Sequence, residues 1–241
     1  MTIEQWNLLS NLVHCYDEYC GHASIDRYIE EQNALPAKVR YRHSSVKPLV
    51  TSIFSNIQVV FEKNRDFFSL FPLSRSNLLR TTVQYDCSIG GLLLTRQHHL
   101  FDNELLCQSV ELIFQSNFTV FAKWMTNQLD PDETFVKLVL AIVAFSTTHS
   151  IVHVQPISSN LIDAKRIFSI QNICVELTWR YLLHRYNHDE AVIRFLNIIR
   201  CLILISQLII EVNESEQLVE MTEAVIKQVE LKLKFSNEDS S

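Results

Sequence analysis

The sequence predicts an all-α fold, and three observations carry that prediction. Hydrophobic residues make up 47% of the 241 residues and charged residues 20%, which is enough apolar material for a sizeable core. The chain has 3 glycines and 5 prolines, too few for the turns of an all-β domain or for glycine-rich nucleotide loops. Apolar residues also recur at helical spacing along most of the chain. Because we find no repeat and no linker, we expect a single domain over residues 1–241.

The first expected helix covers residues 2–20, where apolar side chains return every three or four positions. Thr2 is suited to cap its N-terminus, and Gly21 is suited to end it. The polar stretch 22–45 is typical of a surface loop, with room for a short helix at 25–32.

Two long helices are expected next. Pro48 fits the start of a helix, so we expect one over 48–65. Residues 67–76 are expected to form a turn. The strongly apolar segment 77–97 predicts a buried helix, which Gly90 and Gly91 allow to bend.

Shorter elements are expected at 105–114 and 120–128, followed by the best local helix signal in the chain. Asp130 can cap, Pro131 fits the first helical position and Glu133 can complete a capping box, so a helix is expected up to about residue 145. Further helices are expected over 167–181, 190–212 and 214–235. The segment 190–212 is apolar nearly all round, which indicates either burial on several sides or a subunit contact.

Charge and cysteine spacing exclude several classes of function. The formal net charge is −6, and an acidic domain is repelled by phosphate backbones, so we expect no direct nucleic-acid binding. None of the six cysteines forms a C-x-x-C pair, so no zinc-binding DNA-recognition module is expected. Met1 leads into a polar amphipathic segment rather than a secretory signal, and no run reaches the length of a membrane span. We therefore expect reduced thiols in a nuclear or cytosolic protein.

Features of enzymes are weak in this sequence. Helix capping explains the acidic run after Leu129. Two histidine pairs are spaced by four, His149 with His153 and His184 with His188, but neither has the glutamate of an H-E-x-x-H motif. No nucleophile elbow or phosphate loop is present. We expect no catalytic residue, metal or cofactor, and a helical enzyme with an apolar substrate remains a second alternative.

Several strings, in order, resemble the ligand-binding domain of nuclear receptors. The opening TIEQWNLLSNLVHCYDEY is similar to that family's first helix, and QLDPDETFVKLVLAIVAFS and IFSIQNICVELTWRYLLHRY to its eighth and ninth. The segment FFSLFPLSRSNLLR resembles the family signature, with Ser74 and Arg75 in place of its Asp-Gln pair. The signature positions that match are Phe67, Leu70, Leu78, Leu79 and Arg80. The resemblance implies a three-layer antiparallel helical sandwich of about 10–12 helices.

The resemblance also implies an internal cavity for a small lipophilic ligand, lined by the family's third, fifth and eleventh helices. On this sequence the lining positions are Ile53, Ile57, Val60, Cys87, Gly90, Leu94, Leu204 and Gln207. Arg96 is the candidate on the fifth helix for pairing with a polar group of the ligand. The alternative is that these residues form a filled core with no cavity between them.

Two protein contacts are implied by the same resemblance. Lys63, Arg80 and Glu220 would hold the two ends of an LxxLL coregulator helix. A homo- or heterodimer contact would use the face of the tenth helix, namely Ile193, Leu196, Arg200 and Ile203. Glu133 would pair with Arg200 to brace the eighth and tenth helices. The expected function is that of a nuclear transcription regulator, and the alternative is a ligand-independent helical scaffold or adaptor that binds partner helices.

Overall fold

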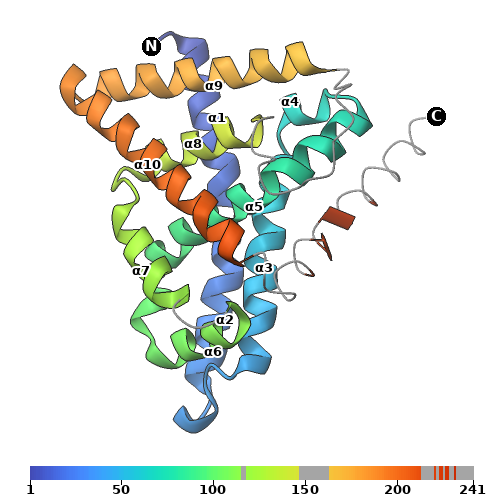
Figure 1. Ribbon diagram of the computed structural model, residues 1–241, viewed down its shortest axis with the longest axis vertical. Helices are drawn as coiled ribbons and strands as arrows, with labels where there is room; N and C mark the ends of the chain where they lie inside the picture. Colours follow the sequence, from blue (N-terminus) through green and yellow to red (C-terminus); the bar gives the residue numbers. More distant parts are fainter. Residues whose placement is uncertain are drawn as a thin grey trace.

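The computed structural model describes residues 1–114, 118–146 and 163–212, and beyond them positions 220, 223, 224, 226, 227 and 231. These residues form ten α-helices and two short 3-10 helices, and none of them lies in a β-strand (Figure 1). The all-α prediction is therefore confirmed. The three-layer arrangement implied by the resemblance stays a prediction.

Helix α1 spans Ile3–Tyr19, and both of its predicted ends are confirmed. The Thr2 hydroxyl accepts a hydrogen bond from the backbone N–H of Gln5, and the Gln5 side chain accepts one from the Thr2 N–H, so the two form a capping box. Gly21 follows with a φ of +103°, a left-handed conformation that glycine adopts without strain. Helix α2 follows this turn and packs against α3.

The stretch 22–45 is not mainly a loop: the short helix allowed for at 25–32 is present and longer, as α2 (His22–Ala34), and a 3-10 helix, η1, occupies Ala37–Val39. Helix α2 buries only Ile25, Tyr28 and Gln32. The buried amide oxygen of Gln32 accepts a hydrogen bond of 2.6 Å from the Tyr41 N–H. A helix with so narrow an apolar stripe resembles a polar loop when only its sequence is considered.

Helices α3 (His43–Glu62) and α5 (Pro72–Gln97) both begin about five residues earlier than expected. Pro48 lies inside α3 rather than at its start. Pro72 takes the first position of α5, where its missing N–H has no helical partner to lose. The four-residue α4 (Arg65–Phe68) connects the two long helices and is capped by Asn64.

The next helices are η2 (Leu100–Asp102), α6 (Glu104–Phe114), α7 (Phe118–Gln128) and α8 (Glu133–Ala144). The expected cap at Asp130 is wrong. Asp132 is the N-cap of α8, and its carboxylate accepts the N–H of Phe135 at 3.2 Å. Asp130 instead accepts the N–H of Asp132 at 2.8 Å and is also used in a longer-range contact.

Helix α9 spans Ala164–Arg185 and α10 spans His188–Val212. Helix α10 buries one face against the body of the protein, through Ala191, Ile198, Cys201, Ile205 and Ile209. The opposite face of α10 is exposed and also carries apolar residues. Helix α10 is therefore not buried on several sides within this chain. The helix expected over 214–235 lies largely outside the described residues. Of its few described positions, Ile226 is helical and buried.

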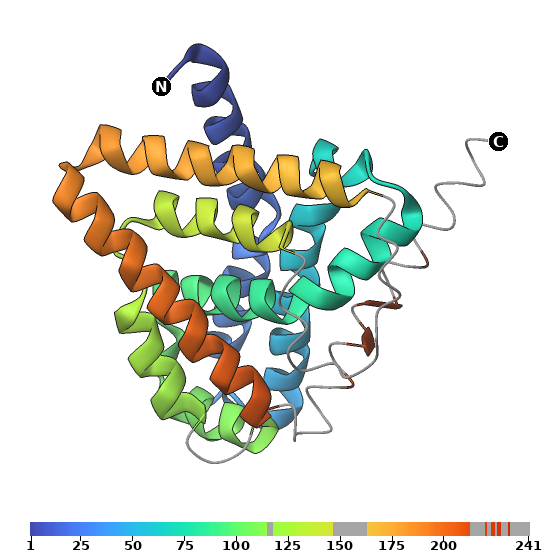
Figure 2. The same cartoon turned by 45° about the horizontal axis from the view of Figure 1, so that its top comes forward.

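Helix α8 lies between α5 and α9, and α10 crosses this stack obliquely (Figure 2). The side chains of α8 are buried on almost every side of the helix, from Phe135 to Leu140. The buried Lys137 in this run pairs with Asp17 of α1, with 2.6 Å between the Nζ and Oδ1 atoms. Among the described helices, none has a stretch apolar and long enough to span a bilayer.

Candidate ligand cavity

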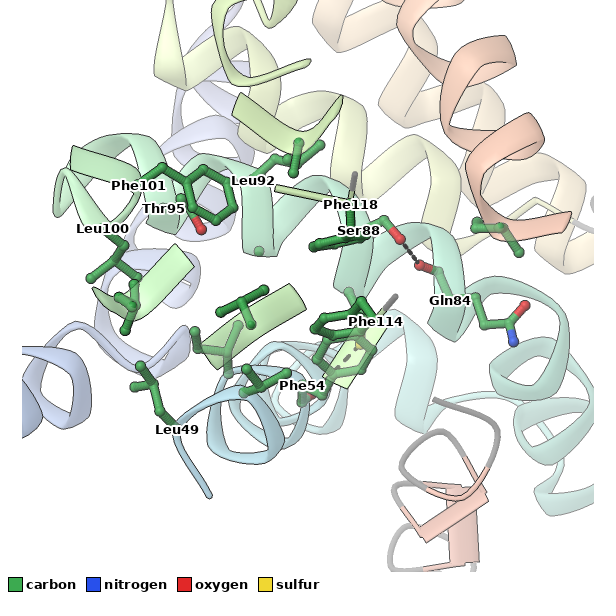
Figure 3. Close-up of a pocket in the computed structure, with 18 residues that line it drawn as sticks. Leu49, Phe54, Gln84, Ser88, Leu92, Thr95, Leu100, Phe101, Phe114 and Phe118 are labelled. Carbon is green, nitrogen blue, oxygen red and sulfur yellow. Dashed lines mark hydrogen bonds between the residues drawn. The ribbon is translucent and has the colours of Figure 1, made fainter. Parts of the chain in front are cut away.

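A partly open apolar cavity of about 110 Å³ is bounded by α3, α5, η2, α6, α7 and the end of α10 (Figure 3). The α3 wall consists of Leu49, Val50, Ile53 and Phe54, which share one face of that helix. The opposite walls are supplied by Leu100 and Phe101 of η2, Leu106, Val110 and Phe114 of α6, Phe118 and Ala122 of α7, and Ile209 of α10. The cavity is thus lined by branched aliphatic and aromatic side chains from six elements.

The α5 wall carries the polar groups of the cavity. It consists of Gln84, Cys87, Ser88, Gly91, Leu92 and Thr95, which recur every three or four residues. The Ser88 hydroxyl donates to the backbone oxygen of Gln84 at 2.7 Å, and the Cys87 thiol lies 3.6 Å from the Phe54 backbone oxygen. The hydrogen-bond donors of Ser88 and Cys87 are therefore already used by backbone oxygens.

Among the described residues, no side chain that lines the cavity carries a charge at neutral pH. Cys87 is the one residue of the lining with an ionisable side chain. Burial raises the pKa of the Cys87 thiol well above its ordinary value, and the nearby Asp86 raises it further. The thiol therefore stays neutral and is a poor nucleophile.

Gly91 shapes the cavity by lacking a side chain. A Cβ atom built on Gly91 would lie 3.8 Å from Cγ2 of Ile53, which is an ordinary van der Waals distance. The space in front of Gly91 is therefore open, and no close approach of backbone requires a glycine there.

Two of the expected lining residues, Ile53 and Cys87, lie on facing walls of the cavity. Gly90 and Leu94 are buried on α5 but away from this wall, and the Gly90 oxygen lies 3.4 Å from the Tyr16 hydroxyl. Leu204 packs against the core, and Gln207 is exposed. The side chains of Ile57 and Val60 lie outside the described part of the chain.

Arg96 is not placed to meet a ligand in this cavity. Its Nη1 atom donates to the backbone oxygens of Leu129 at 3.1 Å and Asp130 at 2.9 Å. The side chain thereby ties the end of α5 to the turn before α8. It stands on a different side of α5 from the cavity lining at Thr95.

The walls that sequence reasoning missed are those of α6 and α7. Phe114 and Phe118 stack with their ring centroids 4.3 Å apart and close one side of the cavity. The expected lining came from three helices of the family pattern, so these two aromatic residues were not considered. Val50 on α3 and Gly91 on α5 also line the cavity and were not expected. Helical spacing could have predicted them, because they lie three residues before Ile53 and four residues after Cys87.

The three residues expected to hold a coregulator helix are all exposed. Lys63 directly follows α3, with its Nζ atom 5.6 Å from the centroid of the Tyr19 ring. Arg80 lies on α5 and Glu220 on a helical position near the C-terminus. Between Lys63 and Arg80 the chain exposes three large apolar side chains, Phe68, Phe71 and Leu73.

The four residues expected at a dimer contact lie on the exposed face of α10. Ile193, Leu196 and Ile203 are 58%, 58% and 57% exposed, and Arg200 is exposed beside them. Their spacing of three or four residues places them in one stripe along α10, which is apolar except for Arg200. Within this chain, the stripe is not packed against the core.

The expected brace between Glu133 and Arg200 is replaced by a different pair. Glu133 accepts a hydrogen bond of 2.7 Å from the Gln97 amide. Arg194 reaches back from α10 to Asp130, with 2.7 Å between Nη1 and Oδ1. The contact that links α10 to the start of α8 is therefore shifted toward the beginning of α10.

Histidines do not assemble a metal site in the described residues, where no group of three or more metal-binding side chains occurs. His184 packs edge-on against Trp6, and His188 packs edge-on against Trp179. His149 and His153 lie outside the described residues.

No protein-family model, curated protein or solved structure matches this chain. The family assignment therefore depends on the resemblance of sequence strings, and it stays a prediction.

Proposed function

We propose that this chain is the ligand-binding and coregulator-recruiting domain of a nuclear-receptor-like transcription regulator that acts in the nucleus. The observation that carries the proposal is the neutral apolar cavity between α3 and α5, with Ile53 and Cys87 on facing walls. Cavities of this kind, apolar with a few polar groups on one side, are typical of sites for lipophilic ligands.

The proposed mechanism is a shift in population. Ile209 is the lining residue on α10 and lies close to the end of that helix, just before the C-terminal segment. A ligand that contacts Ile209 favours one position of that segment, since it stabilises the state to which it binds better. In that state Lys63 and Arg80 pair with the free backbone groups at one end of an LxxLL helix, and Glu220 pairs with those at the other end.

A dimer is part of the proposal. The stripe of Ile193, Leu196 and Ile203 is an apolar surface on a long helix, and burying it against a second receptor domain would remove it from water. The proposal leaves the partner as a second copy or a related domain.

A ligand-independent scaffold is the second candidate, and the size of the cavity favours it. The volume of about 110 Å³ is below the roughly 300–1,000 Å³ of most ligand pockets. In that case the domain would bind partner helices through its surface without any response to a ligand.

The deciding experiment measures thermal stability with a library of lipophilic compounds, with and without an LxxLL peptide. The proposal expects a compound that raises the melting temperature and a further rise when peptide is added. Lys63→Glu should abolish the effect of the peptide and keep that of the ligand, whereas Lys38→Glu, at another exposed lysine, should change neither. A response to peptide without any response to ligands would favour the scaffold, and no response to either would reject both readings.

A further inference from the structure

We propose that the cavity between α3 and α5 selects a compact, uncharged and mainly apolar molecule, with at most one or two neutral polar groups, over the long carboxylate lipids that a generic lipophilic site would accept. This inference rests on the proposed function, because it names the class of ligand for the same cavity. Three properties of the described residues carry it: volume, lack of charge, and the placement of the hydroxyl groups.

Volume limits the size of the ligand. The cavity measures about 110 Å³. An engineered cavity of about 150 Å³, lined by similar aliphatic and aromatic residues, stays dry and binds benzene. The cavity of this protein is smaller than that one, so it is matched to a single small ring rather than to a larger molecule. A chain of sixteen carbons exceeds this volume, so it would have to extend out of the cavity into water or push the walls apart.

Charge is excluded by the walls. None of the lining side chains is an acid or a base apart from Cys87, whose thiol is neutral. The nearest expected partner for a carboxylate, Arg96, donates instead to the backbone oxygens of Leu129 and Asp130. A carboxylate in the cavity would lose its hydration and gain no ion pair, so its binding would be strongly disfavoured.

Polar recognition is confined to the α5 wall. The hydroxyls of Ser88 and Thr95 lie on the same face of α5, two turns apart. The Ser88 hydrogen is already donated to the Gln84 backbone oxygen, which leaves the Ser88 oxygen as an acceptor. An alcohol on the ligand can therefore donate to Ser88 or exchange hydrogen bonds with Thr95, and the rest of its surface meets apolar side chains.

The test is a two-by-two series that separates length from charge: cyclohexylmethanol, cyclohexanecarboxylate, hexadecanol and hexadecanoate. Binding to the full chain is measured by isothermal titration calorimetry and by the shift in melting temperature. We expect cyclohexylmethanol to bind and its carboxylate to bind at least about tenfold more weakly. Both sixteen-carbon compounds should bind more weakly than cyclohexylmethanol.

Variants of the walls locate the binding. Gly91→Ala adds a methyl group to the cavity and should weaken binding of cyclohexylmethanol several-fold while the protein stays folded. Ile53→Ala enlarges the cavity and should admit larger alcohols. Leu94→Ala is the matched control, because Leu94 is fully buried away from the lining, so it should lower stability without changing the preferred ligand size.

The possible failures are distinguishable. Tighter binding of hexadecanoate or hexadecanol than of cyclohexylmethanol would overturn the inference and leave the proposed ligand site standing. Binding of cyclohexylmethanol that Gly91→Ala does not weaken would also overturn it, since the compound would then bind elsewhere. If no compound of the series or of the wider lipophilic library binds, the proposed function fails and the inference fails with it.

Discussion

His22 at the start of α2 and His98 at the end of α5 face each other, with 2.8 Å between Nδ1 of His22 and Nε2 of His98. A hydrogen bond at that distance needs one nitrogen as donor and the other as acceptor, so the facing nitrogens share a single proton. On its far side, His98 Nδ1 lies 3.1 Å from a carboxylate oxygen of Asp26. The three side chains connect α2 to the end of α5, two residues before the cavity residue Leu100.

The first prediction concerns pH. Burial lowers the pKa of His22 below its ordinary value and the neighbouring His98 lowers it further, as does Lys137, whereas Asp17 and Asp26 act in the opposite direction. The unfolded chain therefore binds a proton at His22 more readily than the folded protein does. Stability is retained above about pH 6.5 and is lost as the pH falls below it. Urea unfolding at pH 7.5 and pH 5.5 should show this loss.

His98→Gln should reduce that loss, because glutamine can accept or donate toward His22 but cannot take up a proton. His14→Gln is the control, since His14 is an exposed histidine on α1 that pairs only with Glu18 in the next turn. An equal dependence on pH in the wild type and in His98→Gln would show that His98 does not contribute to the loss of stability.

The second prediction concerns Asp86, a fully buried residue of α5. Among the described residues, its buried carboxyl oxygens have no well-formed hydrogen bond, and the Thr82 side chain compensates them only in part. Burial raises the pKa of Asp86 well above its ordinary value, more than the Thr82 side chain lowers it. For an acid with a raised pKa the cost to the folded state is absent below about pH 4 and grows as the pH rises. Asp86→Asn should therefore increase the free energy of unfolding at pH 7, by at least about 1 kcal/mol.

The gain from Asp86→Asn should shrink as the pH is lowered toward 4, because the carboxyl group of the unfolded wild-type chain then begins to bind a proton as well. Asp189→Asn, at a side chain that is 98% exposed, serves as the control and should change little at either pH. A gain of the same size at pH 4 and pH 7 would mean that packing rather than ionisation is responsible.

Helical periodicity was sufficient to predict the all-α fold and most of its elements, and it failed where few apolar residues or distant pairs decide the structure. Helix α2 was expected only as a short helix within a loop, because one of its three buried positions is Gln32, a polar residue that is buried through its bond to the Tyr41 backbone. The pairing of Asp130 with Arg194 joins residues 64 positions apart, and no local pattern indicates such a partner.

For the cavity too, the sequence predicted the residues that a helical pattern places, and it did not predict those that depend on tertiary contacts. Ile53 and Cys87 were expected because the resemblance to the family places both on helices that line its cavity. Phe114 and Phe118 close the cavity through the packing of α6 against α7, which depends on tertiary contacts. Arg96 was assigned to the ligand by its position on α5, but its bonds to the turn before α8 are set by the three-dimensional fold.

The third prediction contrasts two glycines. Gly21→Ala should destabilise the protein by about 1–2 kcal/mol or more, because its φ of +103° is strained for alanine and the new Cβ would lie 2.3 Å from Nδ2 of Asn56. Gly91→Ala should stabilise it by about 1 kcal/mol, because alanine favours the helix and its Cβ meets only Ile53 at 3.8 Å. Equilibrium unfolding of both variants in urea tests the pair, and the same sign of change for both would contradict the prediction.

The fourth prediction concerns the contact between Arg194 and Asp130. Arg194 also pairs with Glu190 at 2.8 Å and lies over the Tyr186 ring at 3.9 Å, while the Asp130 side chain is 6% exposed. Removing one partner leaves a buried charge uncompensated, so Arg194→Ala should cost about 3 kcal/mol. The exposed pair Arg180 and Glu176 gives the control, since Arg180→Ala should cost less than about 1 kcal/mol. Equal losses for the two variants would show that Asp130 is adequately solvated without Arg194.

The last prediction follows from the exposed stripe of α10. If Ile193, Leu196 and Ile203 bury against a partner domain, a second charge at Leu196, on the apolar side of the stripe before Arg200, should weaken that contact, because the charge would be buried without a counterion. Leu196→Arg should therefore shift the chain toward the monomer in sedimentation velocity, with its melting temperature at low concentration unchanged. Leu112→Arg is the matched control, because Leu112 is 69% exposed on α6, away from α10. A wild-type chain that stays monomeric at high concentration would exclude self-association, and the stripe would then require a different domain as its partner.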